Sequence, residues 1–196
     1  MAIEYCKALE CNDLHVMSGQ CMYGMEELQE ETYITNIRWA ANRLAGDKIR
    51  CHIETISEGT IEYYYLNNLN TTLDLLRKID SENVFFQCDF FHLGMLGEDV
   101  CNVFKENKHN IKHIQVAQTT EREEISESGG VDYEEVFKVL RHEGYQGYVG
   151  LEFMPRKEGG GSLSQFYQAL DMKAPDYEGS LFDYISVLMK DKPAKV

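Results

Sequence analysis

Long apolar segments are missing from this sequence, because no hydrophobic run approaches the roughly 20 residues that a bilayer-spanning helix needs. A basic segment followed by a hydrophobic stretch is also missing at the N-terminus, so no secretory leader is indicated. The six cysteines include no C-x-x-C pair, which argues against a closed zinc site and favours reduced thiols. Together these absences predict a cytoplasmic protein with no membrane partner.

Positive charge is scarce. The chain has 19 basic residues against 33 acidic ones, and its formal net charge is −14. Such a chain repels phosphate backbones and anionic membrane surfaces unless basic side chains gather in one patch, and the sequence shows no such patch. Nucleic acid is therefore not an expected partner, and an anionic ligand requires local positive charge.

Hydrophobic residues make up 43% of the 196 residues, which is enough for one domain with a sizeable core. We expect a single domain over residues 1–196, with a C-terminal helix and tail over residues 171–196. Apart from Gly159-Gly160-Gly161, the sequence contains no low-complexity tract and no internal repeat. This triplet lacks the P-loop pattern, so we expect no nucleotide cofactor. It either cradles a phosphate at a helix N-terminus or serves as a flexible connector.

Hydrophobic periodicity predicts an alternation of helices and short strands. Helical patterns cover residues 1–9, 26–44, 68–79, 99–109 and 132–143. Strand patterns cover the segment around Leu14 and residues 50–56, 84–89, 111–117 and 148–153. This order is typical of an α/β fold with a parallel sheet, whose ligands collect at the carboxyl ends of the strands. Five strands are too few for a closed (β/α)₈ barrel of roughly 250 residues, so we predict a partial (β/α)₈ barrel.

Four predicted strands carry an oxygen-bearing side chain near their C-terminal end: Glu54, Asp89, Gln115 and Glu152. Their separations along the chain, 35, 26 and 37 residues, each leave room for a strand, a loop and a helix. Burying an isolated ionisable group is costly, so four such side chains in this register favour a shared cation. Hard oxygen ligands suit Mg²⁺ or Mn²⁺, with coordination positions left open for water or substrate.

Neighbouring residues extend this predicted site. His92 follows Asp89 by three residues, where it can hydrogen-bond a ligand or act as an ordinary buried polar group. Arg122 and Arg156 lie on the loops that leave the last two of these strands, so they are candidates for binding an anionic substrate. Each carboxylate has an alternative role as the cap of the following helix, and each arginine as a solvated loop residue. Three further histidines are expected to support the ligands or the core: His15, His52 and His113.

Three motifs resemble the hydroxypyruvate isomerase family, which belongs to the xylose isomerase-like (β/α)₈ barrels. They are Gln87-x-Asp89-x-x-His92, the segment from His113 to Gln118, and the segment from Gly147 to Phe153. The segments from Leu14 to Gly19 and from Ile53 to Ile56 also fit, so the resemblance extends from the first helix to about Phe166. In that family three βα units precede the part present here. The resemblance therefore implies that the five strands correspond to strands four to eight of the barrel.

By that resemblance, Glu54 and Glu152 would be the catalytic proton donor and acceptor, and Asp89 and Gln115 would complete the shell of a divalent cation. His92 would contact the substrate. The reaction implied is a 1,2 proton shift between hydroxypyruvate and tartronate semialdehyde, which is 2-hydroxy-3-oxopropanoate, through an enediolate. The expected partner is therefore a small hydroxy or oxo acid.

Two other hypotheses stay open. The same ligand set suits a ketose 3-epimerase or sugar isomerase, which would bind several substrate hydroxyls. Alternatively, the chain is a catalytically silent partial barrel that forms a homo-oligomer or pairs its open edge with a partner, because the absent units are expected to expose strand edges and a contiguous apolar interior. A DNA-repair endonuclease on the same kind of barrel is disfavoured by the net charge of −14.

Overall fold

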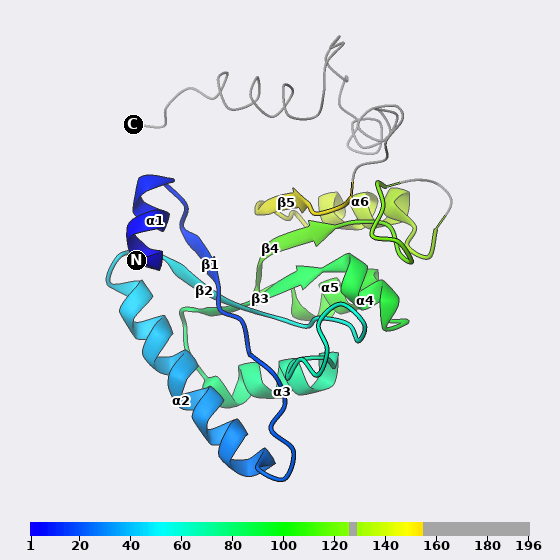
Figure 1. Cartoon of the computed structure of the whole chain (residues 1–196). Coiled ribbons are helices and arrows are strands. Elements are labelled where there is room, and N and C mark those ends of the chain that lie inside the picture. Colours follow the sequence, from blue (N-terminus) through cyan, green and yellow to red (C-terminus); the bar gives the residue numbers. More distant parts are fainter. Residues whose placement is uncertain (126–128, 155–196) are drawn as a thin grey trace.

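The computed structural model of the chain describes residues 1–125 and 129–154. Within them a five-stranded sheet curls into an open half-barrel, with helices along its outer face (Figure 1). No described helix is long and apolar enough to cross a membrane. The glycine triplet at residues 159–161, Arg156 and the predicted C-terminal helix over residues 171–196 lie outside the described residues.

All five strands run parallel and pair in the order in which they occur along the chain. They are β1 (Asp13–His15), β2 (Arg50–Glu54), β3 (Val84–Asp89), β4 (Ile111–Val116) and β5 (Tyr148–Leu151). The predicted α/β fold with five parallel strands is confirmed, because crossovers that contain helices return the chain to the same end of the sheet each time. Strand β2 ends before the predicted Ile56, since the Ile56 amide donates to the Leu66 carbonyl oxygen of the following loop, 2.9 Å away.

Six helices connect or precede the described strands. They are α1 (Ala2–Ala8), α2 (Glu26–Ala45), α3 (Leu69–Ile79), α4 (Phe90–Met95), α5 (Val100–Asn107) and α6 (Tyr133–His142). Helices α3, α5 and α6 begin where the side chain of Asn68, Asp99 or Asp132 accepts a hydrogen bond from a backbone N–H three residues later. Such caps satisfy donors that have no partner within the helix, which explains where these helices begin.

Helix α4 is missing from the sequence prediction. It begins directly after β3, where Asp89 Oδ1 accepts a hydrogen bond from the Phe91 amide at 2.8 Å. Six residues are too few for a helical period to show in the sequence. The helix matters for the site because it carries His92 back over the carboxyl end of β3.

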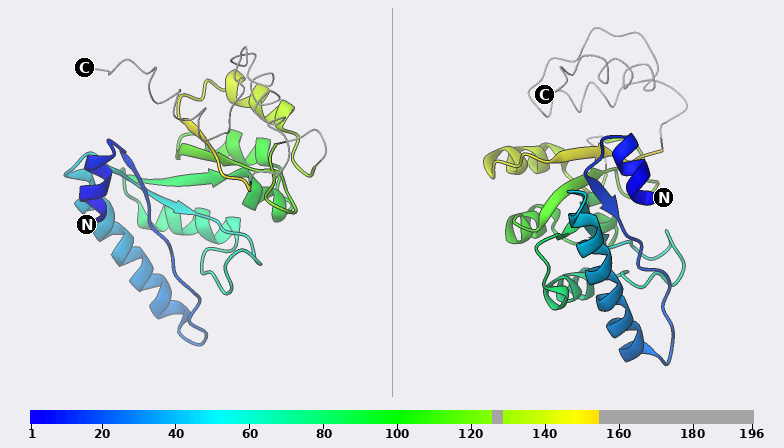
Figure 2. Two further views of the ribbon diagram at one scale, coloured as in Figure 1. Left: turned by 45° about the horizontal axis from the view of Figure 1, so that its top comes forward. Right: turned by 90° about the vertical axis from the view of Figure 1, so that its left-hand side faces the viewer.

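An apolar layer separates the sheet from the helices. Side chains alternate across each strand, and those on the outer face include Ile53, Phe86 and Ile114, all 0% exposed. They belong to one buried cluster together with side chains from the helices, such as Ile37 and Phe137. Helices α2 and α3 lie side by side, as do α5 and α6 (Figure 2). The sheet is thus covered on one face by helices.

The opposite, concave face of the sheet is mostly polar. Phe85 and Tyr148 lie on this face, but most of its side chains are ionisable or carry an amide, and along each strand they alternate with the buried apolar side chains of the other face. The polar ones are Asp13, His15, Arg50, His52, Glu54, Gln87, Asp89, His113, Gln115 and Glu152. The expectation of a contiguous apolar interior is therefore wrong for the part of the chain that the structure describes. Most of these polar groups contact one another within the face, so hydrogen bonds and ion pairs replace the apolar packing that was expected.

Candidate active site

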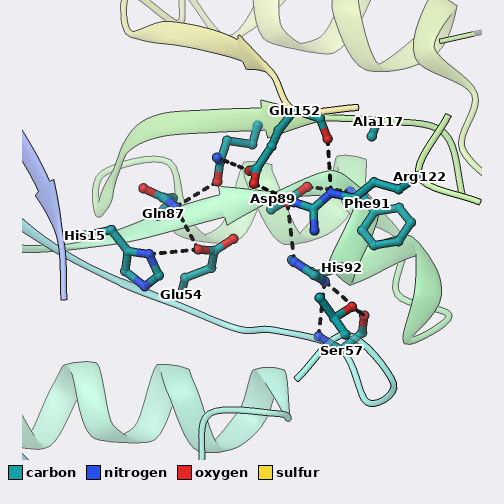
Figure 3. Close-up of polar contacts among 12 residues, drawn as sticks. His15, Glu54, Ser57, Gln87, Asp89, Phe91, His92, Ala117, Arg122 and Glu152 are labelled. Atoms are coloured by element: carbon teal, nitrogen blue, oxygen red, sulfur yellow. Dashed lines mark hydrogen bonds and ion pairs between the residues drawn. The ribbon is translucent and has the colours of Figure 1, made fainter. Parts of the chain in front are cut away.

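Four polar side chains at the carboxyl ends of neighbouring strands form one row of hydrogen bonds (Figure 3). Gln87 on β3 donates from Nε2 to Glu54 Oε2 on β2 and to Gln115 Oε1 on β4, both at 2.7 Å. Gln115 in turn donates from Nε2 to Glu152 Oε2, just after β5. The register explains the row, because Glu54 pairs with Gln87, and Asp89 with Gln115, across adjacent parallel strands.

Arg122 joins Asp89 to Glu152. Its guanidinium lies 3.1 Å from Asp89 Oδ2 and 2.9 Å from Glu152 Oε1, and its Nε donates to the Glu152 carbonyl oxygen at 3.1 Å. The Phe91 ring lies against the guanidinium, with 4.9 Å between the guanidinium carbon and the ring centroid. The positive charge predicted for an anionic substrate is therefore already shared between two carboxylates.

The backbone of Arg122 is as closely held as its side chain. Its φ of 52° lies in the left-handed region, which is uncommon for a residue with a side chain. The Arg122 carbonyl oxygen accepts a hydrogen bond from the Met154 amide at 2.8 Å, which ties the loop after β4 to the chain after β5. These contacts outweigh the backbone cost and keep the guanidinium between Asp89 and Glu152.

Glu54, Asp89 and His92 each place one potential ligand atom so that all three atoms lie within 4.8 Å of one another. Their exposed fractions are 4%, 2% and 1%. Hard carboxylate oxygens such as those of Glu54 and Asp89 suit a divalent cation such as Mn²⁺, and the His92 imidazole lies beside them. The Gln115 amide presents Nε2 to Glu152, so a role as oxygen ligand requires the amide turned by half a turn about its terminal bond.

The carboxyl groups of this cluster have too little positive charge around them. Burial, reinforced by the negative charges of Asp89 and Glu152, raises the pKa of Glu54 to about 9. Burial also raises the pKa of Asp89 to about 7, although the Arg122 guanidinium acts in the opposite direction. A bound divalent cation is the group that would let both carboxyl groups ionise at neutral pH. The donor set and this charge deficit together fit a cation.

His92 is held between the cluster and the loop after β2. Its Nδ1 lies 3.2 Å from the Ser57 amide nitrogen and 2.9 Å from Ser57 Oγ, while its Nε2 lies 3.6 Å from Asp89 Oδ2. Burial and the charge of Arg122 lower the pKa of His92 to about 3, so the imidazole is neutral. The ring therefore offers the site an uncharged polar group.

Two contacting residues, Ser57 and Gln87, were not among the predicted site residues, whereas His15 was expected to support the ligands or the core. His15 Nδ1 lies 3.2 Å from Glu54 Oε2, and burial lowers the pKa of His15 to about 4. Gln87 carried a usable signal, because it lies two positions before Asp89 and so shares its face of the strand. Ser57 carried none, since it reaches His92 from a loop 35 residues away along the chain.

The structure brings together most of the side chains predicted for the site: Glu54, Asp89, His92, Gln115, Arg122 and Glu152. Arg156 lies outside the described residues. His52 is directed away from this group, because its Nε2 contacts Asp13 Oδ1 at 2.5 Å near the beginnings of the strands. The carboxyl groups at the end of β2 and just after β5 are of the kinds that hold cations and transfer protons in proteins.

Comparison with known proteins identifies relatives of this chain. The sequence model of the xylose isomerase-like TIM barrel family matches residues 1–170. The chain is 32% identical over 154 residues to the Drosophila melanogaster protein named "Putative hydroxypyruvate isomerase", covering 79% of this chain and 58% of that protein. It is 32% identical over 159 residues to the 2-oxo-tetronate isomerase of Haemophilus influenzae, covering 81% and 61%. The chain thus spans roughly three fifths of these curated relatives.

Solved structures share the fold. The structure titled as an AP endonuclease of family 2 from Brucella melitensis has a TM-score of 0.78 and 29% sequence identity, covering 85% of this chain and 64% of that one. A D-allulose 3-epimerase from Methylomonas has a TM-score of 0.67 at 16% identity, covering 86% and 59%. At that identity, the likeness to the epimerase shows the fold alone.

Proposed function

Because the chain belongs to the xylose isomerase-like TIM barrel family, we propose that it isomerises hydroxypyruvate to 2-hydroxy-3-oxopropanoate with the help of a divalent cation. The observation that carries the proposal is the meeting of two buried carboxyl groups, Glu54 and Asp89, with Gln115 and Glu152 at one edge of the sheet. Support for the reaction class comes from relatives named hydroxypyruvate isomerase and 2-oxo-tetronate isomerase.

Glu54, Asp89, Gln115 and Glu152 would hold the cation, which is Mg²⁺ or Mn²⁺ on the basis of these oxygen donors. When bound, such a cation would supply positive charge that stabilises negative charge developing on substrate oxygens. It would also lower the pKa of Glu54, whose carboxyl is otherwise raised to about 9, so that this group ionises at working pH.

Proton transfer is assigned to Glu54 and Glu152. One carboxylate removes a proton from C3 of hydroxypyruvate, the hydroxyl proton passes from the oxygen on C3 to that on C2, and the other carboxyl group returns a proton to C2. The two side chains stand on β2 and after β5, with Gln87 and Gln115 bridging the interval between them. Positioned acid–base groups of this kind contribute about 10²–10⁴-fold to a rate.

His92 and Arg122 are proposed to contact the substrate, as is Arg156. His92 presents an uncharged imidazole beside Asp89. Arg122 is already bound to Asp89 and Glu152, so its charge alone is a weak attraction for a substrate carboxylate. The cation would therefore provide most of the attraction for an acid substrate in a chain whose net charge is −14.

Glu152→Gln tests the proposal. We expect kcat on hydroxypyruvate to fall on the order of 10²–10⁴-fold, because the amide can neither accept nor deliver the proton. A chelator should abolish the turnover of the unsubstituted chain, and Mn²⁺ should restore it. The matched control is Glu143→Gln, which removes an acid from a partly buried pair with Lys108 far from the site and should leave kcat unchanged. Wild-type turnover in Glu152→Gln would refute the proposed role.

A substrate panel separates this reaction from its neighbours. The Haemophilus influenzae relative supports a four-carbon oxo acid as the second candidate substrate, so 2-oxo-tetronate belongs in the assay beside hydroxypyruvate. D-allulose represents the ketose epimerases, which share the fold. Turnover of D-allulose without turnover of either acid would replace the proposal with an epimerase.

A catalytically silent assembly is the remaining alternative. Strands β1 and β5 each have one edge with no paired strand among the described residues, and such edges can pair with another chain. Light scattering together with the turnover assay separates the hypotheses. A monomer with chelator-sensitive turnover eliminates the silent assembly, whereas an oligomer without turnover on any of these substrates supports it.

A further inference from the structure

The contact between Ser57 and His92 determines which ring nitrogen of His92 carries the proton. The Ser57 amide nitrogen lies 3.2 Å from His92 Nδ1, with its N–H directed at the ring. A backbone amide can only donate, so Nδ1 must present its lone pair. The proton of the neutral imidazole then resides on Nε2.

The hydroxyl of Ser57 alone would not decide this question. Its Oγ lies 2.9 Å from the same Nδ1 and can either donate to a lone pair or accept from an N–H. If the proton were on Nδ1, the hydroxyl would accept it, but the Ser57 amide would then face another donor in a buried place. An unsatisfied buried donor costs on the order of 1–3 kcal/mol, so the amide selects the form with the proton on Nε2.

The amide cannot easily turn away, because its loop is tied on both sides. The preceding residue, Ile56, donates to the Leu66 carbonyl oxygen at 2.9 Å, and the Ser57 carbonyl oxygen accepts from the Thr60 amide at 3.3 Å. Ser57 and His92 are 2% and 1% exposed, so water does not compete for Nδ1. The orientation of the donor is thus built into the fold.

The other side of the ring faces the candidate site. His92 Nε2 lies 3.6 Å from Asp89 Oδ2, which is longer than an effective hydrogen bond. The N–H on Nε2 is therefore directed toward the carboxyl cluster, and Asp89 Oδ2 is too far away to accept a full hydrogen bond from it. A substrate oxygen that enters beside Asp89 would accept a hydrogen bond from this N–H at a shorter distance.

We propose that Ser57 is a positioning residue that fixes His92 with its proton on Nε2, so that the site presents one uncharged N–H donor to a substrate oxygen beside Asp89. Only the last step, the substrate oxygen, rests on the proposed function. The position of the proton is a property of the free chain and can be measured without any substrate.

Nuclear magnetic resonance of the full chain with isotope-labelled histidine, recorded at neutral pH with chelator, measures the proton position directly. The signals of His92 are identified by their loss in His92→Gln. We expect the Nδ1 resonance at the shift of an unprotonated ring nitrogen and the Nε2 resonance at that of a protonated one. The reverse pattern, or an average of the two, overturns the proposal.

Two variants separate the amide from the hydroxyl. Ser57→Ala keeps the amide, so His92 should keep its proton on Nε2. If Ser57→Ala moves the proton to Nδ1, the assignment to the amide is wrong. Ser57→Pro removes the N–H and should shift the population toward the Nδ1 form. The buried His52, which contacts Asp13 away from Ser57, shows whether this variant is folded, and if it is not, the spectra of the unsubstituted chain and of Ser57→Ala decide between the amide and the hydroxyl.

A kinetic comparison tests the role of the donor. Gln offers an N–H at the end of its side chain and Leu does not, so His92→Leu should lose about tenfold more kcat on hydroxypyruvate than His92→Gln, the equivalent of one good hydrogen bond. Equal losses refute the donor role. Absence of turnover in the unsubstituted chain would instead contradict the proposed function, and the spectra would still decide the position of the proton.

Discussion

The two ends of the concave face use similar side chains with opposite electrostatic results. Near the beginnings of the strands, Asp13 binds Arg50 through two hydrogen bonds of 2.7 and 2.6 Å and also contacts His52. These partners hold the pKa of Asp13 well below its usual range despite burial. At the carboxyl ends, the close partners of Glu54 within residues 1–125 and 129–154 are the neutral Gln87 amide and His15, and its pKa is raised to about 9.

This difference indicates what each end is for. An acid whose charge is neutralised by a fixed arginine is complete, and it holds two strands in register. An acid that is buried among other acids is incomplete until a ligand brings positive charge, which is typical of functional sites. We therefore interpret the Asp13 end of the sheet as structural and propose that the Glu54 end binds the ligand.

The largest expected difference between the ends is in catalysis. Glu54→Gln should lower kcat on hydroxypyruvate on the order of 10²–10⁴-fold, because it removes one of the two proposed proton-transfer groups. Asp13→Asn should leave kcat of the folded protein unchanged. Steady-state kinetics on samples with matched folded fractions would measure both. Equal losses in the two variants would remove the functional distinction between the ends.

Cation binding should depend only on the Glu54 end of the concave face. At a concentration one hundred times its Kd, Mn²⁺ should raise the free energy of unfolding by about 2.7 kcal/mol. Asp89→Asn should weaken this stabilisation, while Asp13→Asn should retain it. Urea denaturation with and without Mn²⁺, supported by calorimetric titration, would measure the effect. Stabilisation that persists in Asp89→Asn would place the cation elsewhere.

Stability in the absence of cation should show the opposite ranking. Asp13→Asn should lower the free energy of unfolding by about 2 kcal/mol, because it leaves Arg50 and His52 without their shared acceptor in a partly buried place. Glu54→Gln should raise it at neutral pH, because the folded Glu54 carboxyl is protonated there while the unfolded one is ionised, and the amide removes the cost of that proton uptake. Urea denaturation in chelator measures both. Glu143→Gln removes one ion pair, with Lys108, whereas Asp13→Asn removes contacts with both Arg50 and His52, so this control should have a smaller effect than Asp13→Asn.

The pH dependence of stability sharpens the comparison further. The folded Glu54 carboxyl keeps its proton up to a pKa of about 9, whereas the ordinary value is 4.5. Between these values the folded state binds more protons than the unfolded state, so the stability of the cation-free chain should fall as pH rises, by at most about 1.4 kcal/mol per pH unit for this one group. Glu54→Gln should remove that part of the slope. An unchanged slope would show that the pKa of Glu54 is not raised in the folded state.

Asp13 should act in the reverse direction. Its pKa is lowered in the folded state, so its stabilisation is present above its usual pKa of 3.8 and is lost as pH falls through the acid range. Denaturation curves of Asp13→Asn and the unsubstituted chain should therefore converge in acid. Curves that stay equally far apart would contradict the role of the Asp13 charge.

Sequence patterns predicted the sheet better than the surroundings of its functional groups. The apolar positions around Glu54 and Asp89 alternate regularly, so both residues could be assigned to strand ends from local periodicity. The same alternation placed Gln87 on the face of Asp89 without revealing that it bridges two neighbouring strands. The short helix α4 escaped prediction because six residues contain less than two helical turns.

By itself, the sequence determined the alternation of helices and strands, and with it the parallel sheet that brings Glu54, Asp89, Gln115 and Glu152 to one edge. These features depend on local periodicity and on the direction in which each crossover returns the chain. Only the tertiary structure decided that Arg122 is shared by two carboxylates, and that the Ser57 amide meets His92. Such contacts depend on strand register and on the paths of loops distant in sequence, which no local pattern encodes.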